Sequence, residues 1–229
     1  MSSEQDTGRR VRRPLLATAL GVLAFLALLA SASDALPWAS GFDLGVHSWV
    51  ISHRTTALTS VAAAITSTAS SAFTAPLVFV VAAVLTHGNL RARLVRACLV
   101  LAVMLCAVLC RYGISELIAR PRPSTADWAV QAGGLSFPSG HTSDGALAAG
   151  LIGWLVIRRF AGRVTPWVVW LIAVAYALLI AWTRVYLGVH WPTDVLGSLA
   201  FVTAWLSGAL VLQLLDEPPL PATTAESAE

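Results

Sequence analysis

The stretch from residue 94 to residue 114, LVRACLVLAVMLCAVLCRYGI, is apolar apart from one arginine near each end. A helix that crosses a lipid bilayer needs roughly 20 consecutive, mostly apolar residues. This run has that length and that composition. It therefore predicts a membrane-spanning helix, and its neighbours along the chain extend the same pattern.

The composition of the whole chain indicates a membrane protein. Of its 229 residues, 57% are hydrophobic and 12% are charged, and the mean hydropathy is +0.73. A soluble domain carries about 25% charged residues, because its surface faces water. Most of this surface must instead face lipid, which excludes a soluble globular protein, and we expect no nucleic-acid partner.

Five further segments are long and apolar enough, or nearly so, to span the bilayer: 15–33, 59–86, 142–158, 165–183 and 194–215. We predict an all-α polytopic membrane protein with six transmembrane helices in one bundle. The membrane domain then covers 15–215, between a basic cytoplasmic N terminus (1–14) and a disordered cytoplasmic tail (216–229). Pro76 predicts a kink in the second span or a surface helix at its start. The alternative for the first span is a cleaved signal peptide ending at Ala30-Ser31-Ala32.

Arginine positions predict the orientation, because basic residues favour the cytoplasmic side. The arginines before the first span and those in the 87–96 and 158–164 loops fall on that side when six spans are counted. The arginines left at the outer side are Arg54, Arg111, Arg120, Arg122 and Arg184. Such residues need a functional explanation. Between the first two spans, Phe42 to Thr56 is predicted as a helix on the outer surface.

Three polar segments, 115–123, 138–141 and 183–194, reach the same outer level in this topology. Charged groups at membrane depth are costly and are usually functional. Arg122 and Arg184 present planar forks of donors that suit phosphate oxygens, and Ser139-Gly140 begins a helix whose free N–H groups favour an anion. The three segments together predict a phosphate-binding site.

A histidine and an aspartate add chemistry to this site. His190 lies near the start of the last span, and Asp194 follows one helical turn later. An acid that fixes the tautomer of a histidine leaves its other nitrogen free to attack, and His141 is placed to protonate a leaving oxygen. A metal pair is the alternative reading of His190 and Asp194. No third ligand has suitable spacing and the arginines around them repel a cation, so we expect no metal and no cofactor.

These segments resemble the three motifs of the type 2 phosphatidic acid phosphatase family, the lipid phosphate phosphatases, which are related to vanadium haloperoxidases. The motifs are a lysine, six residues and Arg-Pro; Pro-Ser-Gly-His; and Ser-Arg, five residues, His, three residues and Asp. The resemblance implies a metal-independent phosphatase that works through a phosphohistidine. By position it makes His190 the nucleophile, Asp194 its orienting acid and His141 the leaving-group acid. It also implies the residues that hold the phosphate: Arg122, Ser139, Gly140 and Arg184.

The sequence departs from this pattern at two positions. Thr183 replaces the motif serine, and Ser115 stands where the motif has lysine, in a chain without any lysine. Losing one cation from a phosphate site weakens transition-state binding by about 3 kcal/mol. We hypothesise that Arg111, one helical turn before Ser115, or Arg120 fills the gap. The second hypothesis is a catalytically weak or inactive lipid-phosphate binder, against which the retained histidines argue.

The predicted substrate is a lipid phosphate or diphosphate, taken at the outer face of a bacterial inner membrane. An isoprenoid diphosphate such as undecaprenyl diphosphate, phosphatidic acid and phosphatidylglycerophosphate all stay open, and the 124–137 loop with Asp127 and Trp128 is expected to shape the choice. A transporter is disfavoured because the spans carry few ionisable residues. A vanadium-using peroxidase is disfavoured because the chain lacks a soluble domain, and the sequence makes no prediction of oligomeric state.

Overall fold

The structure is a computed structural model that describes residues 2–32 and 37–216. Its elements are all helices: α1 (Ser2–Ala32), α2 (Pro37–His53), α3 (Thr56–Ser67), α4 (Ser71–Leu85), α5 (Leu90–Ile118), the 3-10 turn η1 (Thr125–Asp127), α6 (Gly140–Arg159), α7 (Pro166–Tyr186) and α8 (Pro192–Asp216). The all-α prediction is confirmed. The tail predicted to be disordered lies, after Asp216, outside the described residues.

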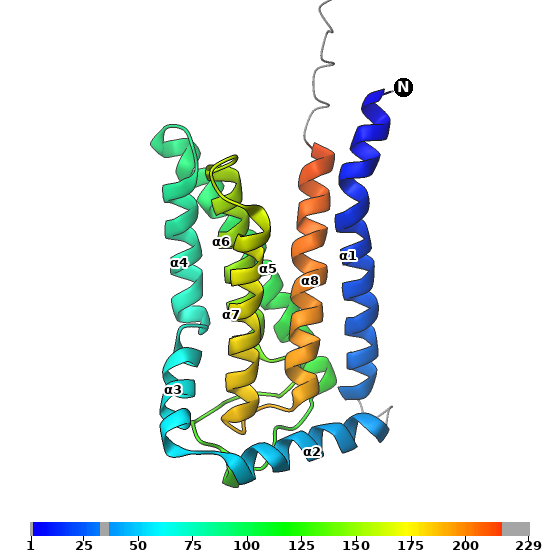
Figure 1. Ribbon diagram of the computed structural model, residues 1–229, viewed down its shortest axis with the longest axis vertical. Coiled ribbons are helices and arrows are strands. Elements are labelled where there is room, and N and C mark those ends of the chain that lie inside the picture. Colours follow the sequence, from blue (N-terminus) through cyan, green and yellow to red (C-terminus); the bar gives the residue numbers. More distant parts are fainter. Residues whose placement is uncertain (1, 33–36, 217–229) are drawn as a thin grey trace, which may run out of the picture.

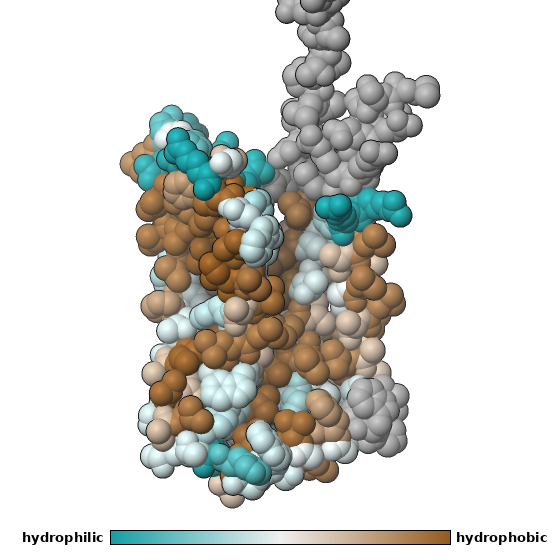
Figure 2. Space-filling model, in the orientation of Figure 1, coloured by the Kyte–Doolittle hydropathy of each residue, from teal (hydrophilic) through white to brown (hydrophobic). Residues whose placement is uncertain are grey.

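Four described helices are long and apolar enough to cross a membrane: Val11–Ala32 of α1, α5, α7 and Pro192–Leu212 of α8. The bent pair of α3 and α4 makes a fifth if it is counted as one span. Figure 2 shows hydrophobic side chains over most of the middle of the visible face. The protein is thus an integral membrane protein, whereas the count of six depends on α6, which carries more polar residues, and stays a prediction.

The second predicted span is broken, but not at Pro76. Helices α3 and α4 meet at an angle of 48° across residues 68–70, while Pro76 lies within α4. At the break, the hydroxyl of Thr68 donates to the Ile65 carbonyl at 2.7 Å, and that of Ser70 donates to the Ser67 carbonyl at 3.1 Å. Side-chain hydroxyls that bond local carbonyls offer the backbone an alternative to the helix. The hydroxyl-rich run, rather than the proline, therefore sets the break.

Helix α2 and the pairing of α1 with α8 define the arrangement of the bundle. Helix α2 lies across the ends of α1, α7 and α8, at the end opposite the N terminus (Figure 1). It covers most of the segment predicted as a surface helix. Helices α1 and α8 run side by side, and a Cβ on Gly21 would lie 2.8 Å from the Ala204 nitrogen, so the glycine permits this contact.

The core that joins the other helices is apolar. A buried cluster links Val78 of α4, Met104 of α5, Leu147 and Leu151 of α6, and Phe201 of α8. Close packing of this kind holds membrane helices together, since lipid supplies no hydrophobic driving force between them. The ends of α5 to α8 are thereby fixed relative to one another.

Candidate active site

The three polar segments converge at the end of the bundle that α2 covers. Helix α5 ends at Ile118, where Ala119 adopts a left-handed conformation (φ 51°) and turns the chain into the segment that leads to α6. The turn between α7 and α8 contains Gly188 at φ 74°, and a Cβ there would lie 2.4 Å from the Asp127 carbonyl oxygen. A glycine is needed at this turn on both counts.

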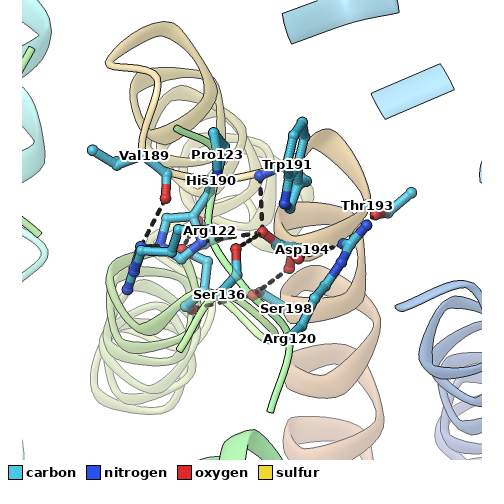
Figure 3. Close-up of polar contacts among 12 residues, drawn as sticks. Arg120, Arg122, Pro123, Ser136, Val189, His190, Trp191, Thr193, Asp194 and Ser198 are labelled. Atoms are coloured by element: carbon cyan, nitrogen blue, oxygen red, sulfur yellow. Dashed lines mark hydrogen bonds and ion pairs between the residues drawn. The ribbon is translucent and has the colours of Figure 1, made fainter. Parts of the chain in front are cut away.

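His190 and Asp194 form a buried pair at the start of α8 (Figure 3). His190 is 1% exposed and Asp194 is fully buried, with 3.3 Å between Nδ1 of the imidazole and Oδ2 of the carboxylate. The same Oδ2 accepts hydrogen bonds from the Trp191 N–H at 2.8 Å and from the Ser136 hydroxyl. These donors fix the carboxylate, and the carboxylate in turn orients the imidazole. The sequence did not indicate Ser136, because its contact spans 58 positions of the chain.

The other imidazole nitrogen faces Arg122. Nη1 of Arg122 donates to Nε2 of His190 at 2.8 Å and to the Val189 carbonyl at 2.8 Å (Figure 3). Because a guanidinium only donates, Nε2 must accept and the ring proton must sit on Nδ1. Burial lowers the pKa of His190 to about 4, which the hydrogen bond to Asp194 only partly offsets and the charge of Arg122 reinforces. His190 is therefore a neutral base with its lone pair on Nε2.

Arg122 is itself fixed by backbone carbonyls. Its Nε donates to Gly134 at 3.0 Å and its Nη2 donates to Gly133 at 2.8 Å. Burial lowers the pKa of Arg122 from its usual value. These contacts hold the guanidinium beside His190.

Arg120 has a different role from Arg122. It donates to Asp43 at 2.7 Å, to Oδ1 of Asp194 at 2.6 Å and to the Thr193 hydroxyl at 2.7 Å. Burial alone would lower the pKa of Arg120, and the two carboxylates outweigh this effect and raise it. Arg120 thus ties α2 to the start of α8. Asp43 carried no signal in the sequence, since it lies in no motif and acts across the fold.

Arg111 and Arg184 approach the N terminus of α6 and the end of α3. The guanidinium carbon of Arg111 lies 3.4 Å from the position that a Cβ on Gly140 would take. Arg184 is 3% exposed and donates to the Thr66 hydroxyl at 3.1 Å. Of the two residues expected to replace the missing lysine, the structure thus brings Arg111 to Gly140 and binds Arg120 elsewhere. Ser115 is buried on the same face of α5 as Arg111.

The Pro-Ser-Gly-His segment begins α6 with no side-chain cap hydrogen bond. Ser139 is fully buried and its hydroxyl accepts from Thr142 at 3.1 Å. His141 is partly exposed and lies within electrostatic range of Arg111, Arg122 and Arg184. A helix N terminus next to three arginines attracts an anion. Within residues 2–32 and 37–216 no group of three or more His, Cys, Asp or Glu side chains could hold a metal.

The loop between α5 and α6 is pinned to α2. The Asp127 carboxylate contacts Nε2 of His47 at 3.0 Å, and the Asp127 carbonyl accepts from Arg54 at 2.7 Å. Trp128 donates from its indole nitrogen to the Pro123 carbonyl at 3.0 Å. Arg54, one of the outer arginines, is thereby given a structural role. Whether this loop selects the substrate stays a prediction.

These features define a class: integral membrane proteins of helical fold with a buried histidine next to a cluster of arginines at a helix N terminus. Residues 93–217 match the family model of the PAP2 superfamily. That match covers more than half of the 229-residue chain. The protein belongs to the PAP2 superfamily, as the motifs predicted.

Individual relatives agree with this assignment. The chain is 38% identical over 87 residues to phosphatidylglycerophosphatase B of Bacillus subtilis, covering 37% of this chain and 42% of that protein. It is 35% identical over 109 residues to undecaprenyl-diphosphatase BcrC of Bacillus subtilis, covering 46% and 50%. The chain thus spans half the length or less of these curated relatives. The crystal structure of a transmembrane PAP2-type phosphatidylglycerolphosphate phosphatase from Bacillus subtilis matches with a TM-score of 0.74 and 27% identity, over 86% of this chain and 96% of that one.

Proposed function

We propose that this protein is a membrane phosphatase that removes phosphate from a lipid phosphate or diphosphate through a phosphohistidine at His190. The observation that carries the proposal is the neutral imidazole, held between Asp194 on Nδ1 and Arg122 on Nε2. Two relatives are named for phosphatidylglycerophosphate and undecaprenyl diphosphate. These lipids are the first substrates to test, and phosphatidic acid is the third.

The first half of the reaction transfers the phosphoryl group to the protein. The phosphate binds at the N terminus of α6, at Ser139 and Gly140, between Arg122 and Arg184. Because Nη1 of Arg122 donates to Nε2 in the resting site, that N–H must move from Nε2 to a phosphate oxygen before attack. Nε2 then bonds to phosphorus, and the bond from phosphorus to the leaving oxygen breaks. His141, which takes up a proton once the anionic phosphate offsets the surrounding arginines, protonates that oxygen. Asp194 stabilises the positive charge that develops on the ring.

The second half returns the protein to its starting state. His141, now neutral, takes a proton from a water that attacks the phosphorus, and the bond between Nε2 and phosphorus breaks. Inorganic phosphate leaves, and His190 is again neutral with its proton on Nδ1. No step needs a metal, because the arginines and the helix N terminus offset the charge of the phosphate.

The test is phosphate release by purified protein from each of the three lipids, with a chelator present. The His190→Ala variant should lose release to the background level, while His53→Ala, an exposed histidine of α2, should keep the parental rate. A 32P-labelled substrate should leave acid-labile label on the parent and none on His190→Ala. Release that stops with the chelator, or that persists in His190→Ala, would contradict the mechanism.

The alternative is a lipid-phosphate binder without turnover, and the serine at position 115 is the observation that favours it. Folded protein that binds these lipids and releases no phosphate from any of them would establish this alternative. The pair of His190 and Asp194 argues against it, since a binder gains nothing from an oriented neutral imidazole.

A further inference from the structure

Arg111 and Asp144 form a buried ion pair whose hydrogen bonds are incomplete. Arg111 is 5% exposed and Asp144 is 3% exposed, and 3.7 Å separates Nε of the arginine from Oδ1 of the aspartate. Among the described residues, neither of these two atoms has a hydrogen-bond partner. Burying charged groups without full hydrogen bonding is costly. Such a cost is tolerated where the groups serve a ligand that completes the site.

The other oxygen of Asp144 is anchored by the broken span. The Ser71 hydroxyl donates to Oδ2 of Asp144, and Ser71 is the first residue of α4, immediately after the break. Asp144 itself follows Pro-Ser-Gly-His on the first turns of α6. The carboxylate is therefore held between two helices and presents its free oxygen to Arg111.

The Arg111 guanidinium occupies the region that the side chain of a lysine at position 115, the motif position, would reach. Arg111 and Ser115 are one turn apart on the buried face of α5. Helical side chains lean toward the N terminus of their own helix, so a long side chain at 115 would cover the turn that contains Arg111. The guanidinium reaches to 3.4 Å from the Cβ position of Gly140, at the start of α6.

We propose that Arg111 binds the substrate phosphate in place of the motif lysine, and that Asp144, anchored by Ser71, is the positioning residue that aims it. This inference rests on the proposed function, because it names a further group at the same site. It also gives a function to one of the arginines on the outer side. The positive charge that is missing at Ser115 is then supplied by Arg111.

A rescue experiment tests the exchange. Arg111→Ala should lower kcat/KM about 100-fold, the usual effect of removing one donor from a developing anion. Adding Ser115→Lys to Arg111→Ala should restore at least about tenfold of that loss, since the lysine reaches the same region. Arg163→Ala, an exposed arginine between α6 and α7, is the matched control and should keep the parental rate. A folded Arg111→Ala variant with the parental rate, or a double variant without any recovery, would overturn the proposal.

Asp144 needs a readout that a purely structural residue would not change. Asp144→Asn should lower kcat/KM about tenfold in the parent, and should have little further effect when Arg111 is already alanine, because coupled residues are not additive. Inhibition by inorganic phosphate should weaken in step with these losses. Glu116→Gln removes an exposed acid from the same end of α5 and should change neither quantity. Equal losses in both backgrounds would reduce Asp144 to a structural role and refute its part in the proposal.

Failure of the proposed function can be separated from failure of this inference. Inorganic phosphate binding to His190→Ala, measured by calorimetry, requires no turnover. Adding Arg111→Ala should weaken that binding at least about tenfold, and unchanged affinity would refute the Arg111 site even if the parent is an active phosphatase.

A separate cavity of about 1150 Å³ lies between the helices in the other half of the bundle. Its walls are apolar side chains of α5, α6, α7 and α8, including Trp154. The basic side chains that line it are Arg13, Arg96, Arg158, Arg159 and His87, and none of its described lining residues is acidic. These basic residues come from the end of the bundle opposite His190.

An apolar cavity with basic residues at one end fits an anionic lipid. Basic pockets between transmembrane helices on the cytoplasmic side bind anionic lipid head groups. We infer that the cavity binds an anionic phospholipid of the inner leaflet, with its phosphate on the arginines and its acyl chains along the apolar walls. The inference is independent of the reaction at His190.

Lipid exchange against mixed vesicles tests this site. Protein from vesicles of phosphatidylcholine and phosphatidylglycerol should retain phosphatidylglycerol selectively in native mass spectra. The double variant Arg96→Gln and Arg159→Gln should lower that retention at least about threefold. Each basic residue contributes about 1 kcal/mol to the attraction of an anionic lipid, and salt screens part of it. The pair Arg91→Gln and Arg163→Gln removes the same charge from exposed positions outside the cavity and should not. Equal retention by both pairs, or no preference over phosphatidylcholine in the parent, would overturn the inference.

Discussion

At the scale of single residues, the protonation state of His190 is the property most directly tied to turnover. Burial lowers its pKa to about 4, below the usual value of about 6.5. A histidine whose pKa is lowered stays neutral at every pH above the shifted value. The proposed nucleophile is therefore available across the neutral range and is lost only as the pH falls through about 4.

We accordingly predict an acid limb of kcat/KM near pH 4, because kcat/KM reports the free enzyme. Phosphate monoesters lose their second proton near pH 6 and add a limb of their own. Titrating the imidazole of His190 by NMR without substrate, with His190→Ala to assign the signal, separates the two because no substrate phosphate is present. A ring that titrates near pH 6.5 would show that the imidazole is not shifted.

At the same scale, the sequence indicated the candidate catalytic residues better than the residues that hold them in place. The three motifs contain His190, Asp194 and Arg122, which the structure brings together. Asp43 and Ser136 lie outside any motif, and their contacts with Arg120 and Asp194 cross 77 and 58 positions of the chain. Residues that meet only in the folded structure form no local sequence pattern, so the sequence alone could not indicate them.

At the scale of elements, the apolar runs predicted every long helix, whereas the break between α3 and α4 was expected at the wrong residue. A proline removes one backbone donor, and a helix packed against neighbours tolerates it. The hydroxyl-rich run at residues 66–71 instead bonds its own backbone and bends the span. The break also brings Thr66 to Arg184 and Ser71 to Asp144.

We therefore propose that the break forms part of the phosphate site, and Thr66 tests this proposal. Thr66→Val removes the hydroxyl that accepts from Arg184 at 3.1 Å. We predict a fall in kcat/KM of about tenfold or more, since a hydrogen bond to a charged group contributes about 1.5–3 kcal/mol. Thr66→Ser should keep most of the parental value, as should Ser60→Ala on the exposed side of α3. Equal values for Thr66→Val and Thr66→Ser would remove α3 from the site.

At the scale of the whole molecule, the open question is whether α6 crosses the membrane. Helix α6 has 20 residues, which at about 1.5 Å each reach across the hydrocarbon layer. Its polar residues Thr142, Ser143 and Asp144 are buried against neighbouring helices and not exposed to lipid. Shielding by protein makes a polar helix acceptable at membrane depth, so we propose six spans with the site facing outward.

Cysteine accessibility in the full chain tests this topology. The three native cysteines, Cys98, Cys106 and Cys110, are free and exposed on α5, so they are first replaced by alanine. Ala126→Cys lies in η1 next to the site, and Ala161→Cys lies between α6 and α7; both positions are exposed. If α6 crosses, an impermeant maleimide labels Ala126→Cys on intact cells, and labels Ala161→Cys only after permeabilisation. Similar labelling at both positions would place both ends of α6 on the same side of the membrane. The six-span topology, with the site on one side and the basic loops on the other, would then be wrong.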